Sequence, residues 1–204
     1  MVTVDERRVP DLLEVRPGDP QRVVTLLPGR GYTPQAPLLR FTSSLLVERG
    51  WTVREVWWSR LPPTGDPQTD ARQALVEGER ALRAVQVREH VVVAKSLGTR
   101  LLPVARELGL PGVWLTPLLR EDTVRGALGA TAVPSLLVGG SADSSAWDHE
   151  VAEQAAPTAG TSGRCQVPTT PWRSPGTPGR RCACSSRSWT GSRAFSLVRT
   201  ELPW

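Results

Sequence analysis

Apolar and polar positions alternate in blocks from residue 21 to about residue 155, and the blocks predict strands and helices in turn. Short apolar runs rich in β-branched residues predict strands, and longer segments with apolar residues three and four positions apart predict helices. The predicted strands are residues 22–27, 51–58, 89–94, 112–115 and 134–139. The predicted helices are residues 37–49, 69–85, a segment through Leu101 and Val104 to Leu108, 121–128 and 147–156. This order is typical of the α/β class, with a doubly wound, mostly parallel sheet.

Three loops follow predicted strands and carry the candidate chemistry. In a doubly wound sheet, ligands bind at the carboxyl ends of the strands. The loops at residues 28–33, 95–97 and 141–145 follow the strands at 22–27, 89–94 and 134–139. We therefore expect these loops to meet at one edge of the sheet.

The turn after the strand at 89–94 has the most informative pattern. The sequence A-K-S-L-G, Ala94 to Gly98, follows the apolar run His90 to Val93 and leads into a predicted helix. A sharp turn from strand to helix needs small residues on both sides of the serine, and it lifts Ser96 above the sheet. The backbone N–H of Leu97 is then free to stabilise an oxyanion. A plain helix N-cap at Ser96 is the alternative interpretation.

Two more segments belong with the serine turn. Residues 26–32 (LLPGRGY) end a strand in a glycine-containing loop, and residues 136–143 (LLVGGSAD) end another in an acidic turn. Together with the serine turn they resemble the α/β-hydrolase superfamily, and most of all its small, capless bacterial members, over about residues 20–156. The resemblance implies a domain over residues 1–156, with residues 1–20 as an N-terminal extension.

The resemblance implies hydrolysis of a small ester-like substrate by a serine nucleophile, without metal or cofactor. Ser96 would be the nucleophile and Asp143 the acid that orients a histidine. Leu97, with Arg30 or Gly31, would supply the oxyanion-hole N–H groups. The chain departs from the family pattern twice, because Ala94 stands for the first glycine of the turn, and Pro28-Gly29 stands where many relatives have His-Gly. Asp148 competes with Asp143 for the acid's role, and a turn or cap is the structural alternative for Asp143.

The histidine of the implied triad is absent from its expected place, a few tens of residues after Asp143. The chain has two histidines. His90 starts a buried strand, far from that strand's catalytic end, and His149 opens the helical segment after Asp143. Because loss of a triad member leaves only a small residual rate, we expect hydrolysis by this chain to be impaired.

The last quarter of the chain differs from the rest. Residues 1–155 carry 18 basic and 19 acidic side chains, whereas residues 156–204 carry seven arginines and one acid. Residues 157–204 form an unpatterned basic tail rich in Pro, Gly, Ser and Thr, and it is expected to be disordered or out of frame. Its three cysteines, Cys165, Cys182 and Cys184, have no histidine nearby, so a zinc site is not expected.

A single-nucleotide frameshift between about residues 156 and 162 is our hypothesis for this tail. When each codon is read from the third base of the codon given, the codons of residues 168–178 permit the sequence Asp-His-Ala-Leu-Glu-Val-Pro-Gly-Asp-Ala. This sequence resembles the segment that carries the catalytic histidine in the family. Residues 180–189 likewise permit an amphipathic helix. We therefore expect the last strand of the sheet and the last helix of the domain to be missing or replaced.

The remaining expectations concern partners and location. The sequence has no apolar run near the ~20 residues of a membrane span, and no signal-peptide pattern, so a cytoplasmic protein with a small-molecule substrate and no membrane partner is expected. The scattered arginines of the tail argue against a nucleic-acid arm. A non-catalytic ligand-binding module and a basic-tail interaction protein remain the alternatives, and the oligomeric state is open.

Overall fold

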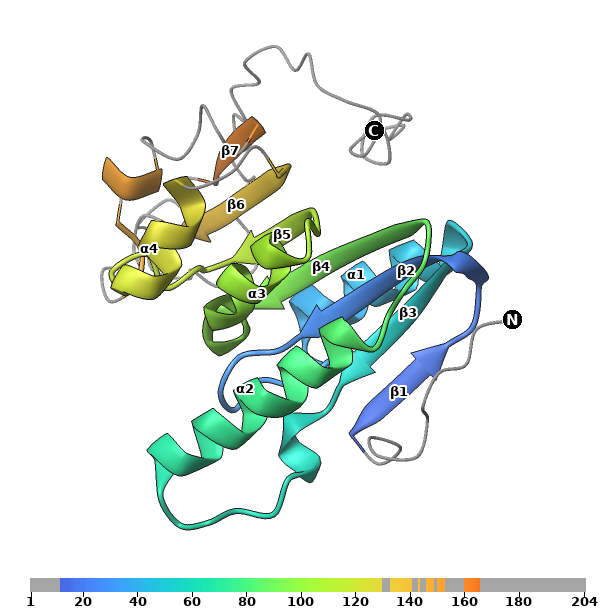
Figure 1. The fold of residues 1–204 in the computed structure, drawn as a ribbon, viewed down its shortest axis with the longest axis horizontal. Coiled ribbons are helices and arrows are strands. Elements are labelled where there is room, and N and C mark those ends of the chain that lie inside the picture. The colour runs from blue at the N-terminus through green and yellow to red at the C-terminus, as the bar shows by residue number, and fades with distance from the viewer. Residues whose placement is uncertain are drawn as a thin grey trace, which may run out of the picture.

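A computed structural model describes residues 12–129, 133–140, 143, 146–148, 150–152 and 160–165. Its centre is a seven-stranded sheet in the order β1-β3-β2-β4-β5-β6-β7, drawn in Figure 1. Only β1 is antiparallel to its neighbour, and the other pairs are parallel. The strands are β1 (Leu13–Arg16), β2 (Asp19–Leu27), β3 (Trp51–Val56), β4 (Glu89–Lys95), β5 (Gly112–Leu115), β6 (Ser135–Gly140) and β7 (Gly160–Cys165).

Helices cover both faces of this sheet. Helix α1 (Pro37–Glu48) packs on one face through Leu39, in a core cluster with Val24, Val53 and Val93. Helices α2 (Pro67–Arg83), α3 (Leu102–Glu107) and α4 (Asp122–Gly129) pack on the other face, as Figure 1 shows. The predicted α/β class with a doubly wound, mostly parallel sheet is confirmed.

Burial on both faces explains the continuous apolar runs of the central strands. Neighbouring residues of a strand point to opposite faces, and in β4 both Val92 and Val93 are buried, one in each core cluster. A parallel sheet covered on both sides therefore has apolar runs instead of an alternating pattern. Trp51 and Trp114 are buried in opposite clusters, so both are packing residues of the core.

The sheet gains a strand at each edge that the pattern did not predict. Strand β1 lies within the expected N-terminal extension and pairs with β3. Strand β7 pairs with β6, where the last strand was expected to be missing or replaced. Its sequence, GTSGRC, contains no apolar run, so periodicity gives no signal for it. Residues 166–204, which hold most of the basic tail, lie outside the described residues.

Two clusters of buried polar side chains lie between the strands and their helices. Arg54 donates to the Ala81 carbonyl at 2.7 Å, and burial lowers its pKa to about 10. On the other face, the Glu55 carboxylate is fully buried and accepts from Ser43 Oγ at 2.6 Å. Arg16 Nε lies 2.9 Å from the same carboxylate oxygen, without the alignment of a hydrogen bond. The contacts of Glu55 thus link β3 to Arg16 of β1 and to Ser43 of α1.

Among the helices of the described residues, none combines the length and the apolar character that a membrane-crossing helix needs.

Candidate functional site

Ser96 occupies a strained turn at the carboxyl end of β4. Its φ angle is +46°, in the left-handed region that residues with a side chain rarely enter. Ser96 is also the first residue of a short 3-10 helix, η2 (Ser96–Leu101), which continues into α3. No described residue forms a hydrogen bond with Ser96 Oγ. A strained, half-buried serine between a strand and a helix has the geometry of a nucleophile turn.

Two glycines allow the serine turn to touch the loop after β2. A Cβ on Gly98 would lie 2.6 Å from the Leu27 carbonyl oxygen, and the Gly98 N–H donates to the Pro28 carbonyl at 3.1 Å. A Cβ on Gly29 would lie 3.3 Å from the Cβ of Ser96. The close approach of these backbones brings the loop after β2 against the serine.

Replacement of Gly98 by alanine should destabilise the fold by about 1–3 kcal/mol, because the new methyl group meets backbone that cannot move away cheaply. Urea denaturation of Gly98→Ala measures this loss. Gly126→Ala is the matched control, since its Cβ meets nothing within 4 Å and the site is an exposed position in α4. That control should gain up to about 1 kcal/mol from helix propensity. Equal stabilities for the two variants would contradict the close packing at Gly98.

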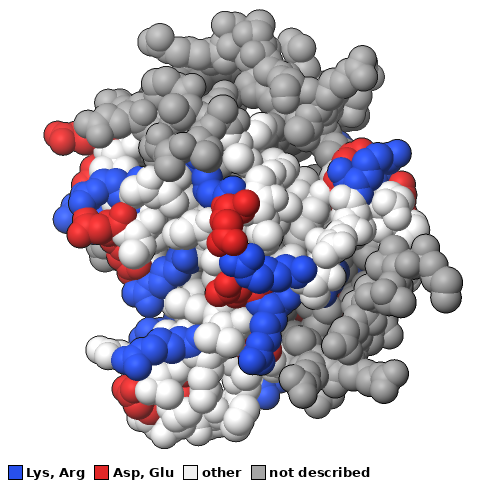
Figure 2. Space-filling model, in the orientation of Figure 1, with Lys and Arg blue, Asp and Glu red and all other residues white. Residues whose placement is uncertain are grey.

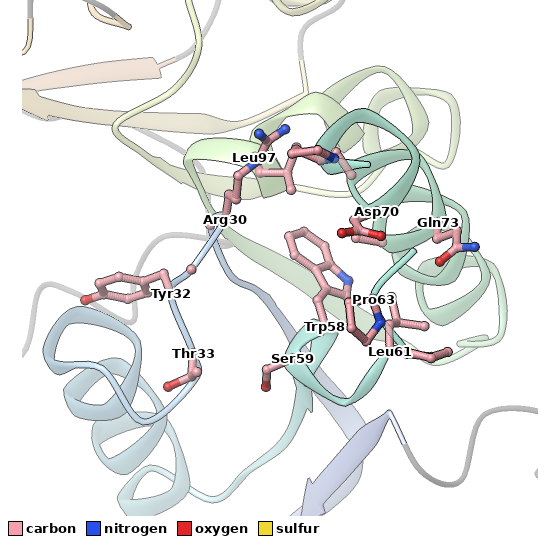
Figure 3. Close-up of a pocket in the computed structure, with 16 residues that line it drawn as sticks. Arg30, Tyr32, Thr33, Trp58, Ser59, Leu61, Pro63, Asp70, Gln73 and Leu97 are labelled. Carbon is pink, nitrogen blue, oxygen red and sulfur yellow. The ribbon is translucent and has the colours of Figure 1, made fainter. Parts of the chain in front are cut away.

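All three residues expected to form the oxyanion hole line one cavity. Leu97, Arg30 and Gly31 border a space of about 450 Å³, and Gly31 has a φ of +64°. The rest of the lining comes from the loop after β3 and from α2, as Figure 3 shows. The structure thus places the loop at 28–33 and the turn at 95–97 side by side, and the cavity opens next to both.

The cavity has an apolar wall and a charged rim. Trp58, Leu61 and Leu97 supply much of the apolar surface. Arg30 and Asp70 lie on different sides of the rim (Figure 3), and hydrogen bonds from Thr64, aided by the charge of Arg30, hold the pKa of Asp70 below its usual value. The Arg30 side chain has no ion pair or hydrogen bond with another described residue. An uncharged, compact ligand with a polar end fits such a lining.

Lys95, which precedes the serine, lies over the loop instead of in the cavity. Its Nζ is 4.7 Å from the centre of the Tyr32 ring, a cation–π contact. Tyr32 in turn accepts a hydrogen bond from the Leu38 N–H at 3.0 Å. These contacts hold the loop after β2 against the end of β4.

Asp143 lies three residues beyond the end of β6. Its carboxylate accepts from the Ala146 N–H at 3.3 Å, and its carbonyl accepts from the Trp147 N–H at 2.9 Å. Trp147 packs so closely on Gly139 that a Cβ there would clash with its ring. Strand β5 separates β4 from β6, so the strand ends before Ser96 and Asp143 are about 10 Å apart. Asp148, the competing acid, accepts from the Val151 N–H at 3.2 Å, as a capping residue does.

His90 is at the opposite end of β4 from Ser96. Six residues of extended strand separate the two, which corresponds to about 20 Å. His90 Nε2 lies 2.9 Å from Thr25 Oγ1, and burial, with a smaller effect of Arg54, lowers its pKa to about 4. His90 therefore cannot take a proton from Ser96. His149 lies outside the described residues.

Sequence reasoning missed most of the cavity. Trp58 packs on the core and also lines the cavity. Asp70 and Ala74 line it from α2. No sequence signal marks these residues, because their role depends on how α2 lies over the strand ends. Trp57 is half buried beneath Arg60 and lies outside the cavity lining.

Charges of both signs are mixed on the surface shown in Figure 2. Arg83 pairs with Glu79 and Glu107, and Arg100 pairs with Glu121. Within the described residues, no group of three or more His, Cys, Asp or Glu side chains could hold a metal ion.

No protein-family model and no curated protein sequence matches this chain. Solved structures do match it. A dienelactone hydrolase from Anabaena variabilis is 19% identical with a TM-score of 0.54, over 82% of this chain and 83% of that one. Est1E from Butyrivibrio proteoclasticus is 11% identical with a TM-score of 0.55, over 77% and 83%. At these identities the likeness concerns the fold alone, and this chain shares the α/β fold of these two structures over most of its length.

Proposed function

We propose that this chain is a serine hydrolase-type protein whose Ser96 attacks a small ester-like substrate, and whose turnover is impaired because the described part of the chain puts no histidine beside that serine. The observation that carries the proposal is the strained turn of Ser96 against the loop after β2, with Leu97, Arg30 and Gly31 around one cavity. A strained serine at the end of a central parallel strand is where an acyl-transfer nucleophile is needed.

The chemistry follows from these positions. Ser96 Oγ adds to the carbonyl carbon of the ester, and the backbone N–H groups of Leu97 and of Arg30 or Gly31 donate to the oxyanion. The intermediate collapses with release of the alcohol and leaves an acyl-serine, which water then hydrolyses. In both steps a base must take a proton from the attacking oxygen, and in this proposal Asp143 orients such a base. Without it, acylation is slow and deacylation slower.

The missing base is the reason to propose that the tail is read out of frame. In the shifted reading, the codon that spans Pro168 and Thr169 permits aspartate, and the codon that spans Thr169 and Thr170 permits histidine. This histidine would follow Asp143 after one more strand, which is the order of the family's triad. The complete protein would then be an active hydrolase.

Labelling with an alkyl fluorophosphonate tests the role of Ser96. We expect slow covalent labelling of this chain, located at Ser96 by peptide mass spectrometry, and none of Ser96→Ala. Ser59→Ala is a matched control, since Ser59 lines the same cavity but lies after β3. A folded chain that takes up no label, or that is labelled equally in Ser96→Ala, would contradict a nucleophilic Ser96.

One observation favours a second candidate, a non-catalytic ligand-binding module. The cavity is complete without Ser96, which is not among its lining residues. If binding alone is the function, the affinity for a small ester or its acid should be the same in Ser96→Ala, and calorimetry should show it.

A further inference from the structure

Helix α1 lies alone on its face of the sheet, and the order of the strands explains why. A right-handed crossover places its helix on a face that depends on the direction in which the chain moves across the sheet. The chain moves one way from β2 through α1 to β3, and the opposite way from β3 through α2, α3 and α4 to β6. Figure 1 accordingly shows α1 on the other side of the sheet from α2. Within the described residues, no helix other than α1 contributes to the core cluster on that face.

Strands β4, β5 and β6 are less well buried on the face of α1 than on the other face. Neighbouring residues of each strand point to opposite faces. The residues that face α2, α3 and α4, such as Val92, Trp114 and Leu137, are fully buried. Four apolar residues on the face of α1 are only partly buried: Val91, Val113, Leu136 and Val138. This part of the sheet therefore keeps apolar surface that α1 does not cover.

Helix α1 turns an apolar stripe toward the same region. Three exposed residues, spaced three and four positions apart, form the stripe: Leu38 (51% exposed), Phe41 (72%) and Leu45 (47%). At about 3.6 residues per turn, the stripe lies on the flank of α1 opposite Ser43, which donates to Glu55 of β3. The N–H of Leu38 donates to Tyr32, whose ring contacts Lys95 of β4. The stripe is therefore on the β4 side of α1.

These two surfaces together have the size of one helix. We call them the open face: the stripe of α1 together with Val91, Val113, Leu136 and Val138. Strands lie about 4.8 Å apart and packed helices about 8–10 Å apart, so one helix covers about two strands. Since α1 packs on β2 and β3, the next helix position on this face is over β4 and β5. An amphipathic helix in that position would bury its apolar side against the strands and against the stripe.

We propose that the open face binds one amphipathic helix, and that its occupant is the helix that the codons over residues 180–189 encode in the shifted frame. This inference rests on the reading frame in the proposed function, and not on the role of Ser96. In that frame the codons permit Ala-Ala-Leu-Arg-Val-Leu-Glu-Gln-Val-Val. On a helix the apolar residues of this sequence share one side, and Arg, Glu and Gln occupy the other.

The length of chain after the last described strand allows this path. Strand β7 ends at Cys165, and residues 166–179 lie between it and the proposed helix. The open face is two or three strands from β7, about 10–15 Å, which a connection of this length spans easily. Because β7 is parallel to β4, the connection starts at the edge of the sheet where Ser96 lies, and it includes the codon that permits histidine. The docked helix would thus anchor the loop that carries the general base.

Leu45→Asp tests the proposal in two full-length proteins, the present chain and the protein with the reading frame restored. In the restored protein the new charge would lie beneath the helix, and we expect the unfolding temperature to fall by about 6–10 °C. In the present chain the side chain is exposed, so the shift should stay within about 2 °C. Val76→Asp is the matched control, because Val76 is 48% exposed on α2, which packs on the opposite face. Its shift should stay within about 2 °C in both proteins.

Leu45→Ala repeats the test with a smaller change, and it should lower the unfolding temperature by about 4–8 °C in the restored protein alone. Shifts within about 2 °C for both Leu45 variants of the restored protein would overturn the proposal. A large shift in the present chain would also overturn it, because the stripe would then be covered already. Light scattering would identify that cover as the present tail in a monomer, or as a second copy in a dimer. None of these measurements involves Ser96, so an unreactive serine would contradict the proposed hydrolysis and leave this inference standing.

Discussion

A version of this protein with the reading frame restored between codons 156 and 162 should hydrolyse p-nitrophenyl acetate on the order of 10⁴-fold faster than the chain with the present tail. The proposed nucleophile, oxyanion donors and acid precede the shift, so both proteins share them. They differ in the general base, because the restored frame permits histidine where this chain has Thr169 and Thr170. Turnover with a chromogenic ester measures the difference directly.

Two controls identify the source of the gain. Ser96→Ala in the restored protein should abolish it, and a glutamine codon in place of the restored histidine should return the rate to that of the present chain. If the restored protein folds, yet hydrolyses the ester no faster, the missing base is not what limits this site. The DNA sequence from about codon 150 to past the stop shows independently whether an inserted or deleted base is present.

The second large effect concerns pH. We expect the free energy of unfolding to fall by about 3 kcal/mol between pH 6.5 and pH 4, because of His90. Burial lowers the pKa of His90 to about 4, from a usual value of 6.5. Between these values the unfolded chain binds a proton that the folded chain does not, so stability rises with pH. The stabilisation is complete above pH 6.5 and is lost as the pH falls toward 4.

Urea denaturation at a series of pH values checks this slope. His90→Gln cannot be protonated, and the slope between pH 4 and 6.5 should largely disappear. The exposed carboxylates with lowered pKa, Asp66, Asp70 and Glu107, begin to lose their hydrogen-bond stabilisation only below about pH 5, so they contribute little to the slope between pH 5 and 6.5. A slope that survives in His90→Gln and disappears in His149→Gln would show that the wrong histidine has been chosen.

Sequence reasoning located the main helices and the central strands because their patterns are strong. The apolar run of β4 and the periodic segments of α1 and α2 were each predicted within a few residues of the observed bounds. Strands β1 and β7 were not predicted, because an edge strand forms by pairing with its neighbouring strand, and neither sequence carries an apolar run. The helix expected after Ser96 begins as a 3-10 turn, since the strained serine delays regular helical geometry until Leu102.

The candidate site was predictable where a motif marks a turn, or where the strand order brings two loops to the same edge of the sheet. Ser96 and Leu97 belong to one turn, and a small-x-Ser-x-Gly pattern reveals such a turn. The cavity joins the loop after β2, the loop after β3 and one side of α2, and no spacing along the chain encodes that meeting.

Lys95 is the only lysine in the chain, and it immediately precedes Ser96. A lysine-specific endoprotease can therefore cut this protein at one peptide bond alone, the bond that joins these two residues. That bond lies in the strained turn, where the side chain of Lys95 is held over the Tyr32 ring. The rate at which the chain splits into its two pieces thus reports how often the turn opens, and it does so without label, substrate or substitution.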